Sequence, residues 1–369
     1  LDDAKMRIVS AEKNISLYTL TRVVSVEKDG DRILSVTGRH VVSGELTRFS
    51  APVFADCTGD GTVGYLAGAD YRVGRESRSE YNESSAPQIA DNMVLGASLQ
   101  WSSKKDNEPS SFPEFSYGIN LSDESYQKMT KGSWTWETGM NLNQIDDFER
   151  IRDYGLLVVY SNWSFLKNHY SLKADYAGRS LGWVAYIAGK RESRRLVGDY
   201  ILKQDDVDKQ VFHEDASFTL TWHFDLHFPD PVNSERFPGN EFKAATKSNP
   251  IHPYAAPYRC LYSRNVDNLF MAGRDISTTH VVLGSARLMR TGAMMGEVVG
   301  MAAGICKEKG TTPRGVYQDY LPELKALMRR GAARTDIPLP DNQHFNEGGF
   351  LKEKPHIMAV PSSRGKVVQ

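Results

Sequence analysis

Residues 268–277 read Asn-Leu-Phe-Met-Ala-Gly-Arg-Asp-Ile-Ser. The apolar run ahead of Gly273 has the length and composition of a short buried strand, and the glycine ends it. A glycine at the end of a strand lets the backbone approach a ligand closely, because it carries no Cβ. We therefore predict that Arg274 and Asp275 lie at the carboxyl edge of a sheet, where open α/β folds bind their ligands.

A second buried strand is predicted at residues 51–57, which read Ala-Pro-Val-Phe-Ala-Asp-Cys. It ends in the turn Thr58-Gly59-Asp60-Gly61, and a short helix of small residues is predicted over 62–68. Residues 15–49 form short apolar segments that are separated by turns such as Lys28-Asp29-Gly30-Asp31. This spacing predicts an antiparallel meander.

The stretch between these two strands has a different character. It holds all six tryptophans of the chain together with many tyrosines and polar loops, which favours a separate, inserted domain. Within it, apolar residues recur at helical spacing over 181–202 and predict an amphipathic helix. Further helices are predicted at 285–306 and 315–330. We therefore divide the chain into a first segment over 1–75, an insert over 76–260, a returning segment over 261–330 and an unassigned tail over 331–369.

The composition is that of an ordinary globular protein. Of 369 residues, 40% are hydrophobic and 25% are charged, and the net charge is -1. This balance gives no reason to expect nucleic acid or an anionic membrane as a partner. The three cysteines, Cys57, Cys260 and Cys306, lie far apart, which argues against a cysteine-bound metal cluster or a disulfide framework. No apolar run reaches the ~20 residues of a transmembrane helix, and no signal region predicts a compartment.

Residues 59–64, Gly-Asp-Gly-Thr-Val-Gly, satisfy the pattern G-x-G-x-x-G between a predicted strand and a predicted helix. One interpretation is a dinucleotide-binding turn with a pyrophosphate at the helix N-terminus. Against it, the helix is very short, no second parallel strand follows, and the turn comes after a meander. A glycine turn that is needed only for positive φ is an equally simple interpretation.

Three segments, taken in order, resemble the FAD-dependent oxidoreductases of the type with two dinucleotide-binding domains. Residues 55–61, Ala-Asp-Cys-Thr-Gly-Asp-Gly, are similar to a T-G-D-G segment that lies against the flavin in that family. Residues 268–277 resemble its N-L-x-x-A-G-R-x-I-S segment, and residues 283–287, Leu-Gly-Ser-Ala-Arg, resemble L-G-S-x-R at the start of its closing helix. The resemblance covers residues 15–310 and depends on the joint order of the segments.

The resemblance implies an α/β (α+β) fold, a three-layer Rossmann-like FAD/NAD(P)-binding domain with an inserted mixed substrate domain. It implies FAD as the cofactor and a small molecule as the substrate. In that family a pyrophosphate-binding G-x-G-x-x-G precedes the meander, and residues 1–14 contain none, so we expect an incomplete FAD-binding domain, as in a truncated chain. The motifs assign the flavin-binding candidates Thr58, Gly59, Asp60, Gly61, Gly273, Arg274, Asp275, Gly284 and Ser285.

The predicted closing helix carries two further expectations. If it begins after Gly284, its free backbone N–H groups and positive dipole end point at the flavin. Four glycines recur along it at every fourth residue, and close packing of the helix on the sheet explains them without a ligand. We prefer that interpretation for Gly292, Gly296, Gly300 and Gly304.

His280 is the first candidate for catalysis. The resemblance places it near the edge of the flavin ring, where a histidine could exchange the proton that accompanies hydride transfer. A histidine that only caps the following helix is the alternative. We predict no bound metal for the flavin site.

Two other catalytic candidates, His227 and Arg191, lie in the insert. On a strand, His223, Asp225 and His227 would share one face. That face would be the wall of a substrate pocket, a metal site or a solvent-exposed edge. Arg191 and Arg195 are four residues apart, so on the predicted helix they would together hold a carboxylate or sugar hydroxyls. A solvated basic face is the alternative for this pair.

The leading hypothesis is an enzyme that transfers a hydride between a small organic substrate and flavin N5. The tryptophans of the insert could stack on sugar rings, which would make the substrate a sugar or polyol, and the alternative is that they are core residues. The alternatives are a cofactor-free carbohydrate-binding or structural module on the same fold, an inactive fragment, and a metal-dependent enzyme built on residues 223–227.

Overall fold

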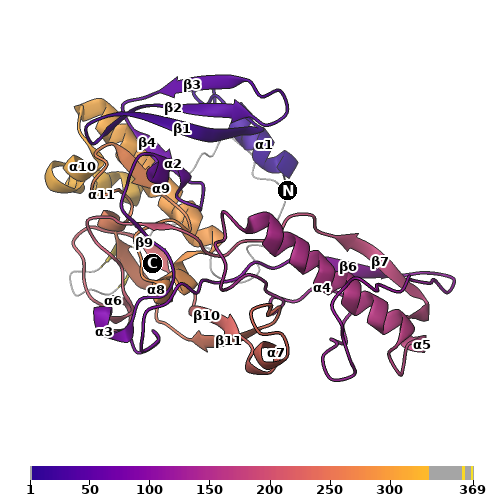
Figure 1. Cartoon of the computed structure of the whole chain (residues 1–369). Coiled ribbons are helices and arrows are strands. Elements are labelled where there is room, and N and C mark those ends of the chain that lie inside the picture. Colours follow the sequence, from indigo (N-terminus) through magenta and orange to yellow (C-terminus); the bar gives the residue numbers. More distant parts are fainter. Residues whose placement is uncertain (1, 332–359, 362–366, 369) are drawn as a thin grey trace. The chain divides into compact units, whose positions relative to one another are not determined.

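A computed structural model describes residues 2–331, 360–361 and 367–368 of the chain (Figure 1). The chain divides into two compact units. Unit 1 comprises Leu1–Arg72, Arg194–Trp222 and Ile251–Gln369, and unit 2 comprises Val73–Ser193 and His223–Pro250. The insert that we expect over 76–260 therefore differs from unit 2, because residues 194–222 and 251–260 belong to unit 1. In the described part of the chain, no helix is both long enough and apolar enough to cross a membrane.

The predicted meander is confirmed in unit 1. Strands β1 (Thr21–Asp29), β2 (Arg32–His40) and β3 (Leu46–Ser50) form an antiparallel sheet in that order. Ile33 and Val36 of β2 are buried and belong to the core of this unit. The first helix, α1 (Asp2–Ala11), precedes the sheet in the chain.

The two predicted buried strands pair with each other. Strand β4 (Phe54–Asp56) and strand β13 (Leu269–Met271) are parallel, and Met271 lies opposite Asp56. Helix α2 (Thr62–Leu66) follows β4 as predicted, and its N-cap Gly61 has φ 59° and ψ 37°, in the left-handed region that favours glycine. Parallel pairing brings the segments after both strands to the same edge, so the motifs around Thr58 and Gly273 lie together.

The C-terminal helices of unit 1 begin and end at other residues than predicted. Helix α8 (His280–Ala286) and helix α9 (Met289–Lys309) replace the single helix expected at 285–306, because Leu288 between them is extended. Gly284 therefore lies inside α8, and the expectation that a helix starts there is wrong. Helices α10 (Pro313–Asp319) and α11 (Leu321–Arg330) replace the one expected at 315–330, since a proline in the first turn of α11 disfavours helical backbone just before it.

The expected packing of the glycine face of α9 is also wrong. The helix packs against β9 (Ala216–Leu220), α10 and α11 through its opposite face, which includes Met295, Val298 and Ala302. A Cβ placed on any of the four glycines at 292, 296, 300 and 304 would meet no described atom within 4 Å.

Short elements complete the described part of unit 1. They include three two-stranded pairs: β5 (Tyr71–Arg72) with β8 (Arg195–Leu196), β9 with β12 (Tyr254–Pro257), and β14 (Val360–Pro361) with β15 (Val367–Val368). Helix α6 (Gln204–Asp208) and the 3-10 turn η1 (Tyr258–Cys260) flank β9 and β12 in the chain. Most of the tail that we left unassigned from 331 lies outside the described residues.

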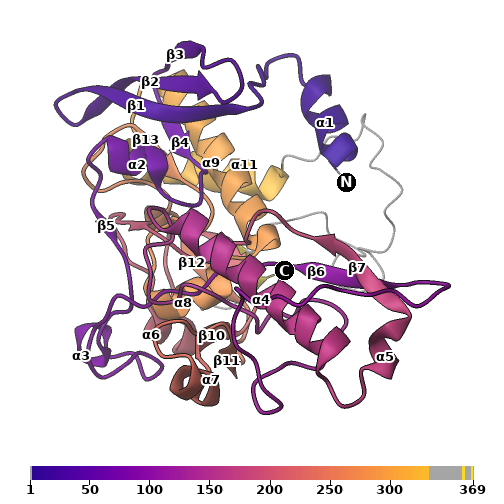
Figure 2. The ribbon, with the colours of Figure 1, turned by 45° about the vertical axis from the view of Figure 1, so that its right-hand side comes forward.

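Unit 2 is organised around one long helix, α4 (Phe148–Asn168) (Figure 2). Strands β6 (Trp101–Lys105) and β7 (Arg179–Val184) form an antiparallel pair that shares its core with this helix. A second antiparallel pair, β10 (Phe224–Pro229) with β11 (Ala244–Asn249), carries the predicted histidine segment. The remaining helices are short: α3 (Arg78–Tyr81), α5 (Ala174–Ala177) and α7 (Pro231–Arg236). Trp101, Trp136 and Trp163 are core residues here.

The amphipathic helix predicted over 181–202 does not form. Residues 179–184 belong to β7, and Arg195 and Leu196 form β8. Two causes favour strands in this stretch. Glycines at 182, 189 and 198 weaken a helix, and pairing with β6 and β5 satisfies the backbone instead. Arg191 and Arg195 therefore share no helix face.

Candidate functional site

The motifs at the carboxyl ends of β4 and β13 meet in unit 1. The Arg274 guanidinium lies 3.6 Å from the Asp60 carboxylate. Gly59 has φ +69°, and a Cβ there would approach Arg274 Nη2 to 2.7 Å. Gly273 has φ +129°, a conformation that side-chain-bearing residues rarely adopt. The backbone conformation therefore requires glycine at both positions. At Gly59 a side chain would in addition clash with Arg274.

Asp56 organises the turn after β4, although we did not predict a role for it. Its side chain is fully buried. Its Oδ1 accepts hydrogen bonds from the Thr58 amide at 3.0 Å and the Thr58 hydroxyl at 2.7 Å. Its Oδ2 accepts one from the Gly64 amide at 2.9 Å. Three donors around one carboxylate fix the shape of the predicted flavin-binding turn.

Asp275, on the neighbouring strand end, is buried beside Asp56. Burial and the negative charge of Asp56 raise the pKa of Asp275 well above its usual range. The neutral acid is therefore favoured over the carboxylate to higher pH than in a solvent-exposed aspartate. Neither side-chain oxygen of Asp275 has a hydrogen-bond partner among the described residues.

Buried hydroxyls follow Asp275 in the segment between β13 and α8. The hydroxyls of Ser277 and Thr278 are buried and have no hydrogen-bond partner among the described residues. Buried polar groups are normally satisfied, so an orphaned pair next to the candidate site points to a polar ligand. These two residues were not among the predicted ones.

Arg194 adds a cation to the same turn of unit 1. Its guanidinium lies 3.7 Å from the centre of the Tyr65 ring, and its Nη1 is 3.5 Å from the carbonyl oxygen of Asp60. We predicted basic residues in this stretch to act as a helical pair of Arg191 with Arg195. The structure instead places Arg194 beside the glycine turn.

The remaining flavin candidates of unit 1 are buried in α8. Ser285 is fully buried and donates a hydrogen bond from its hydroxyl to the Trp222 carbonyl at 2.6 Å, which accounts for its polar side chain structurally. His280 is the first residue of α8 and is 4% exposed. The helix is capped by Thr279, whose hydroxyl accepts from the Val282 amide, so the alternative of a capping role for His280 is wrong.

Unit 2 gathers the other two catalytic candidates around Glu137, a residue that we did not predict. His227 contacts this buried carboxylate through Nδ1 and Asp225 through Nε2 at 3.1 Å. Burial alone would lower the pKa of His227, but the hydrogen bonds to Asp225 and Glu137 outweigh burial and raise it. His227 therefore favours the charged form between two carboxylates.

Arg191 approaches the same oxygen of Glu137 as His227 does, with its Nη2 at 3.6 Å from Oε1. Its guanidinium also donates to the Gly96 carbonyl at 3.0 Å, the Ser98 hydroxyl at 2.9 Å and the Trp134 carbonyl at 3.2 Å. Arg191 is thus a buried, multiply bonded cation and not part of a solvated basic face. Only spatial pairing across the chain brings it to His227, so local patterns gave no signal for this cluster.

The strand predicted for the histidine segment begins only after His223, so the three side chains do not all lie on one strand face. Asp225 and His227 are on β10, and His223 Nε2 lies 3.8 Å from Asp225 Oδ1. His223 and Asp225 are partly exposed, whereas His227 is buried. Across the described residues, no group of three or more His, Cys, Asp or Glu side chains is arranged to hold a metal ion.

Comparison with known proteins adds one finding. A family model described as FAD dependent oxidoreductase matches residues 4–328 of the chain. No significant match was found to a curated protein or to a solved structure. The matched range contains every candidate residue of both units.

Proposed function

Since the chain belongs to the family of FAD-dependent oxidoreductases, we propose that it transfers a hydride between a small organic substrate and flavin N5. The family makes the protein an oxidoreductase with FAD as its cofactor and implies a Rossmann-like fold, with which the mixed helices and strands agree. The identity of the substrate and the nature of the transferred species are our proposal. The observation that carries it is the meeting of the turns after β4 and β13.

The residues at these two turns fit a flavin nucleotide. The glycines at 59, 61 and 273 have positive φ, so backbone can approach the cofactor without a Cβ in between. Arg274 supplies a positive charge, and the buried carboxyl group of Asp275, whose pKa is raised, precedes the orphaned hydroxyls of Ser277 and Thr278 in the chain. We propose that Thr58–Gly61 and Gly273–Asp275 contact the cofactor, with Gly284 and Ser285 supporting them from α8.

When bound, FAD supplies a two-electron acceptor for the hydride that leaves a substrate carbon. The protein must then take the proton from the adjacent hydroxyl or amino group, so that a carbonyl or imine forms. We propose His223, with Asp225 as its charge partner, as the acceptor of that proton, because both side chains are partly exposed, His223 just before β10 and Asp225 on it. The buried His227 and Glu137 act as positioning residues that hold Asp225 in place.

Arg191 and its neighbour Trp134 support a polyhydroxylated or sugar-like substrate. Arg191 holds the Trp134 carbonyl, and the Trp134 side chain is 75% exposed. An exposed indole stacks on the apolar face of a sugar ring. His280 remains a second candidate for proton exchange near the flavin ring, as the resemblance implies.

The test begins with the purified chain reconstituted with FAD. We expect a yellow protein whose flavin absorbance is bleached anaerobically by a sugar or polyol from a panel, with a primary isotope effect when the reacting C–H is deuterated. His223→Gln should slow flavin reduction roughly 10²- to 10⁴-fold, as loss of a general base does, at unchanged flavin content. If His280 exchanges the proton instead, His280→Gln should slow flavin reduction and His223→Gln should not.

His169→Gln is the matched control, because His169 is an exposed histidine of the same unit and pairs with Glu114. It should leave the reduction rate unchanged. His227→Gln should lower the rate and shift its pH profile, which a merely structural role would not do. A flavin that no substrate in the panel reduces, or equal rates for the wild type and His223→Gln, would contradict the proposal.

A further inference from the structure

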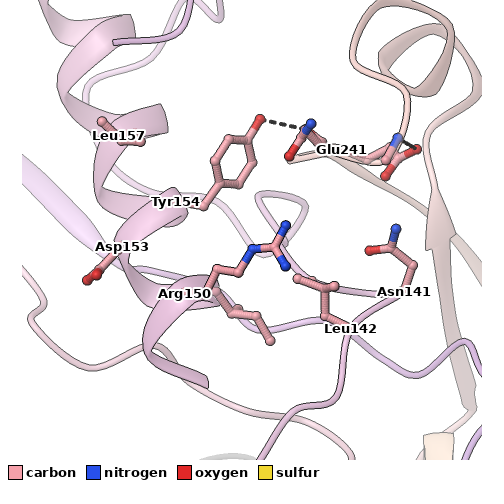
Figure 3. Close-up of a pocket in the computed structure, with 11 residues that line it drawn as sticks. Asn141, Leu142, Arg150, Asp153, Tyr154, Leu157 and Glu241 are labelled. Carbon is pink, nitrogen blue, oxygen red and sulfur yellow. Dashed lines mark hydrogen bonds between the residues drawn. The ribbon is translucent and has the colours of Figure 1, made fainter. Parts of the chain in front are cut away.

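Unit 2 contains an open pocket of about 430 Å³ that takes no part in the proposed chemistry (Figure 3). One wall is a face of α4 that carries Arg150, Tyr154 and Leu157. The opposite wall consists of two loops that carry Asn141 and Glu241. All lining residues belong to unit 2, and Arg191 and His227 are not among them.

Arg150 is the cation of this pocket. Its guanidinium points from α4 across the cavity towards the loops, whereas Asp153 points away (Figure 3). Within the described part of the chain Arg150 forms no ion pair, although the adjacent Arg152 pairs with Asp153 and Glu149. Arg150 also lies in the first turn of α4, where the helix dipole disfavours a cation. Helix stability therefore does not explain its presence.

Glu241 is the anion of the same pocket. Its Oε1 accepts a hydrogen bond from the Gly239 amide at 3.0 Å, which fixes the carboxylate at the loop. Burial and the charge of Glu241 raise the pKa of Tyr154 to about 12, so its hydroxyl stays protonated and donates to the Asn240 carbonyl at 2.5 Å. No ion pair joins Glu241 to Arg150 among the described residues, although both line the same pocket.

We propose that this pocket binds a free α-amino acid with an apolar side chain. The carboxylate of the ligand would pair with the Arg150 guanidinium and accept from the Asn141 amide, and its ammonium group would pair with Glu241. Leu142, Ile151 and Leu157 line the pocket and would contact the apolar side chain. The proposal is carried by the placement of one cation and one anion, neither of which forms an ion pair with a described residue, in a cavity with aliphatic walls.

Other small molecules match the pocket less well. A simple carboxylic acid would meet the repulsive charge of Glu241, and a simple amine would meet that of Arg150. A neutral sugar would leave both charges without a counter-charge. A zwitterion alone satisfies both groups at once, and specificity arises from the repulsion of the other classes as well as from the attraction.

The experiment is titration calorimetry of the FAD-loaded protein with L-leucine, L-leucinamide, 4-methylpentanoate and glucose. We expect L-leucine to bind and each compound that lacks one of its charges to bind at least tenfold more weakly. Arg150→Gln and Glu241→Gln should each weaken L-leucine binding tenfold or more. Arg152→Gln and Glu235→Gln are matched controls outside the pocket, and they should keep the wild-type affinity.

Three outcomes would overturn the proposal. The first is no binding of L-leucine at millimolar concentrations. The second is equal binding of 4-methylpentanoate, L-leucinamide or glucose, which would mean that the pocket does not read both charges. The third is an affinity that Arg150→Gln and Glu241→Gln leave unchanged. Flavin absorbance and the circular dichroism spectrum of each variant show independently that it is folded, so a failure here does not bear on the proposed redox function.

Discussion

Two adjacent carboxyl groups in unit 1 differ in their environment. Asp56 accepts three hydrogen bonds from Thr58 and Gly64, whereas Asp275 is buried without such donors and has a strongly raised pKa. In the unfolded chain Asp275 loses its proton near pH 4, but in the folded protein it keeps it to much higher pH. The stability that Asp275 contributes is therefore fully present below about pH 4 and is lost as pH rises through the folded pKa.

We predict that Asp275→Asn removes the loss of stability that Asp275 causes as the pH rises. Between about pH 4 and pH 7, the free energy of unfolding of the wild type should fall relative to that of Asp275→Asn by up to about 1.4 kcal/mol per pH unit. Asparagine has nearly the same size and shape as a neutral aspartic acid, so the variant should fold. Urea unfolding of both proteins over this pH range measures the difference.

The control is Asp56→Asn, which replaces an acceptor oxygen that the Gly64 amide needs. It should destabilise the protein by about 1–3 kcal/mol, because a buried donor loses its partner. If the wild type and Asp275→Asn keep a constant difference in unfolding free energy over the pH range, Asp275 is not the neutral acid described here.

At the scale of single residues, the sequence predicted the local part of the site and missed the rest. Thr58, Gly59 and Gly273 stand in short motifs, and the need for positive φ in a glycine turn can be read from the chain itself. Glu137 stands in no motif, and the motif that contains Asp56 gave that residue no predicted role. Their importance arises from neighbours far along the chain or from hydrogen bonds to backbone, which no local pattern reveals.

Among the elements, short apolar segments with turn punctuation were easier to predict than helices. The meander follows from short apolar segments separated by turns, and strands β4 and β13 follow from compact apolar runs that end at glycine turns. The helix predicted at 181–202 failed because helical spacing of apolar residues occurs by chance in a stretch that pairs as strands. The strands that pair lie far apart in the sequence, so local propensity and periodicity cannot predict the pairing.

Helix α9 gives a prediction about its exposed glycines. Gly300 lies in the interior of the helix, and a Cβ there would meet no described atom within 4 Å. Gly300→Ala should therefore stabilise the protein by about 1 kcal/mol, because alanine loses less backbone entropy on folding into a helix. Thermal and urea unfolding measure the change, and Gly296→Ala should repeat it.

Gly155 in α4 is the matched comparison. It is also a helix-interior glycine, but its Cβ would lie 3.2 Å from Leu99 Cβ. There the same substitution lowers the backbone-entropy cost of folding but crowds Leu99. Gly155→Ala should therefore stabilise the protein less than Gly300→Ala does, or destabilise it. A clear destabilisation by Gly300→Ala would show that the glycine face of α9 is covered in the protein in solution.

In the molecule as a whole, each unit has a core of its own. The core of unit 2 contains Trp101, Trp136 and Trp163, whereas that of unit 1 is built from aliphatic residues of the meander, α2 and β13. The sequence indicated this division through the change in composition after residue 75. It could not place residues 194–222 in unit 1, because the chain returns there through strand pairing and not through a linker.

The distribution of tryptophans allows the unfolding of the two units to be followed separately. Only Trp222 lies in unit 1, so in Trp222→Phe all remaining indole fluorescence comes from unit 2. Flavin fluorescence, which rises when FAD is released, reports on the site of unit 1.

Because each unit has its own core, we expect urea to produce two transitions with different midpoints. Added FAD should shift the flavin transition to higher urea by mass action and leave the tryptophan transition in place. Coincident transitions that both move with FAD would show instead that the two units unfold as one cooperative structure.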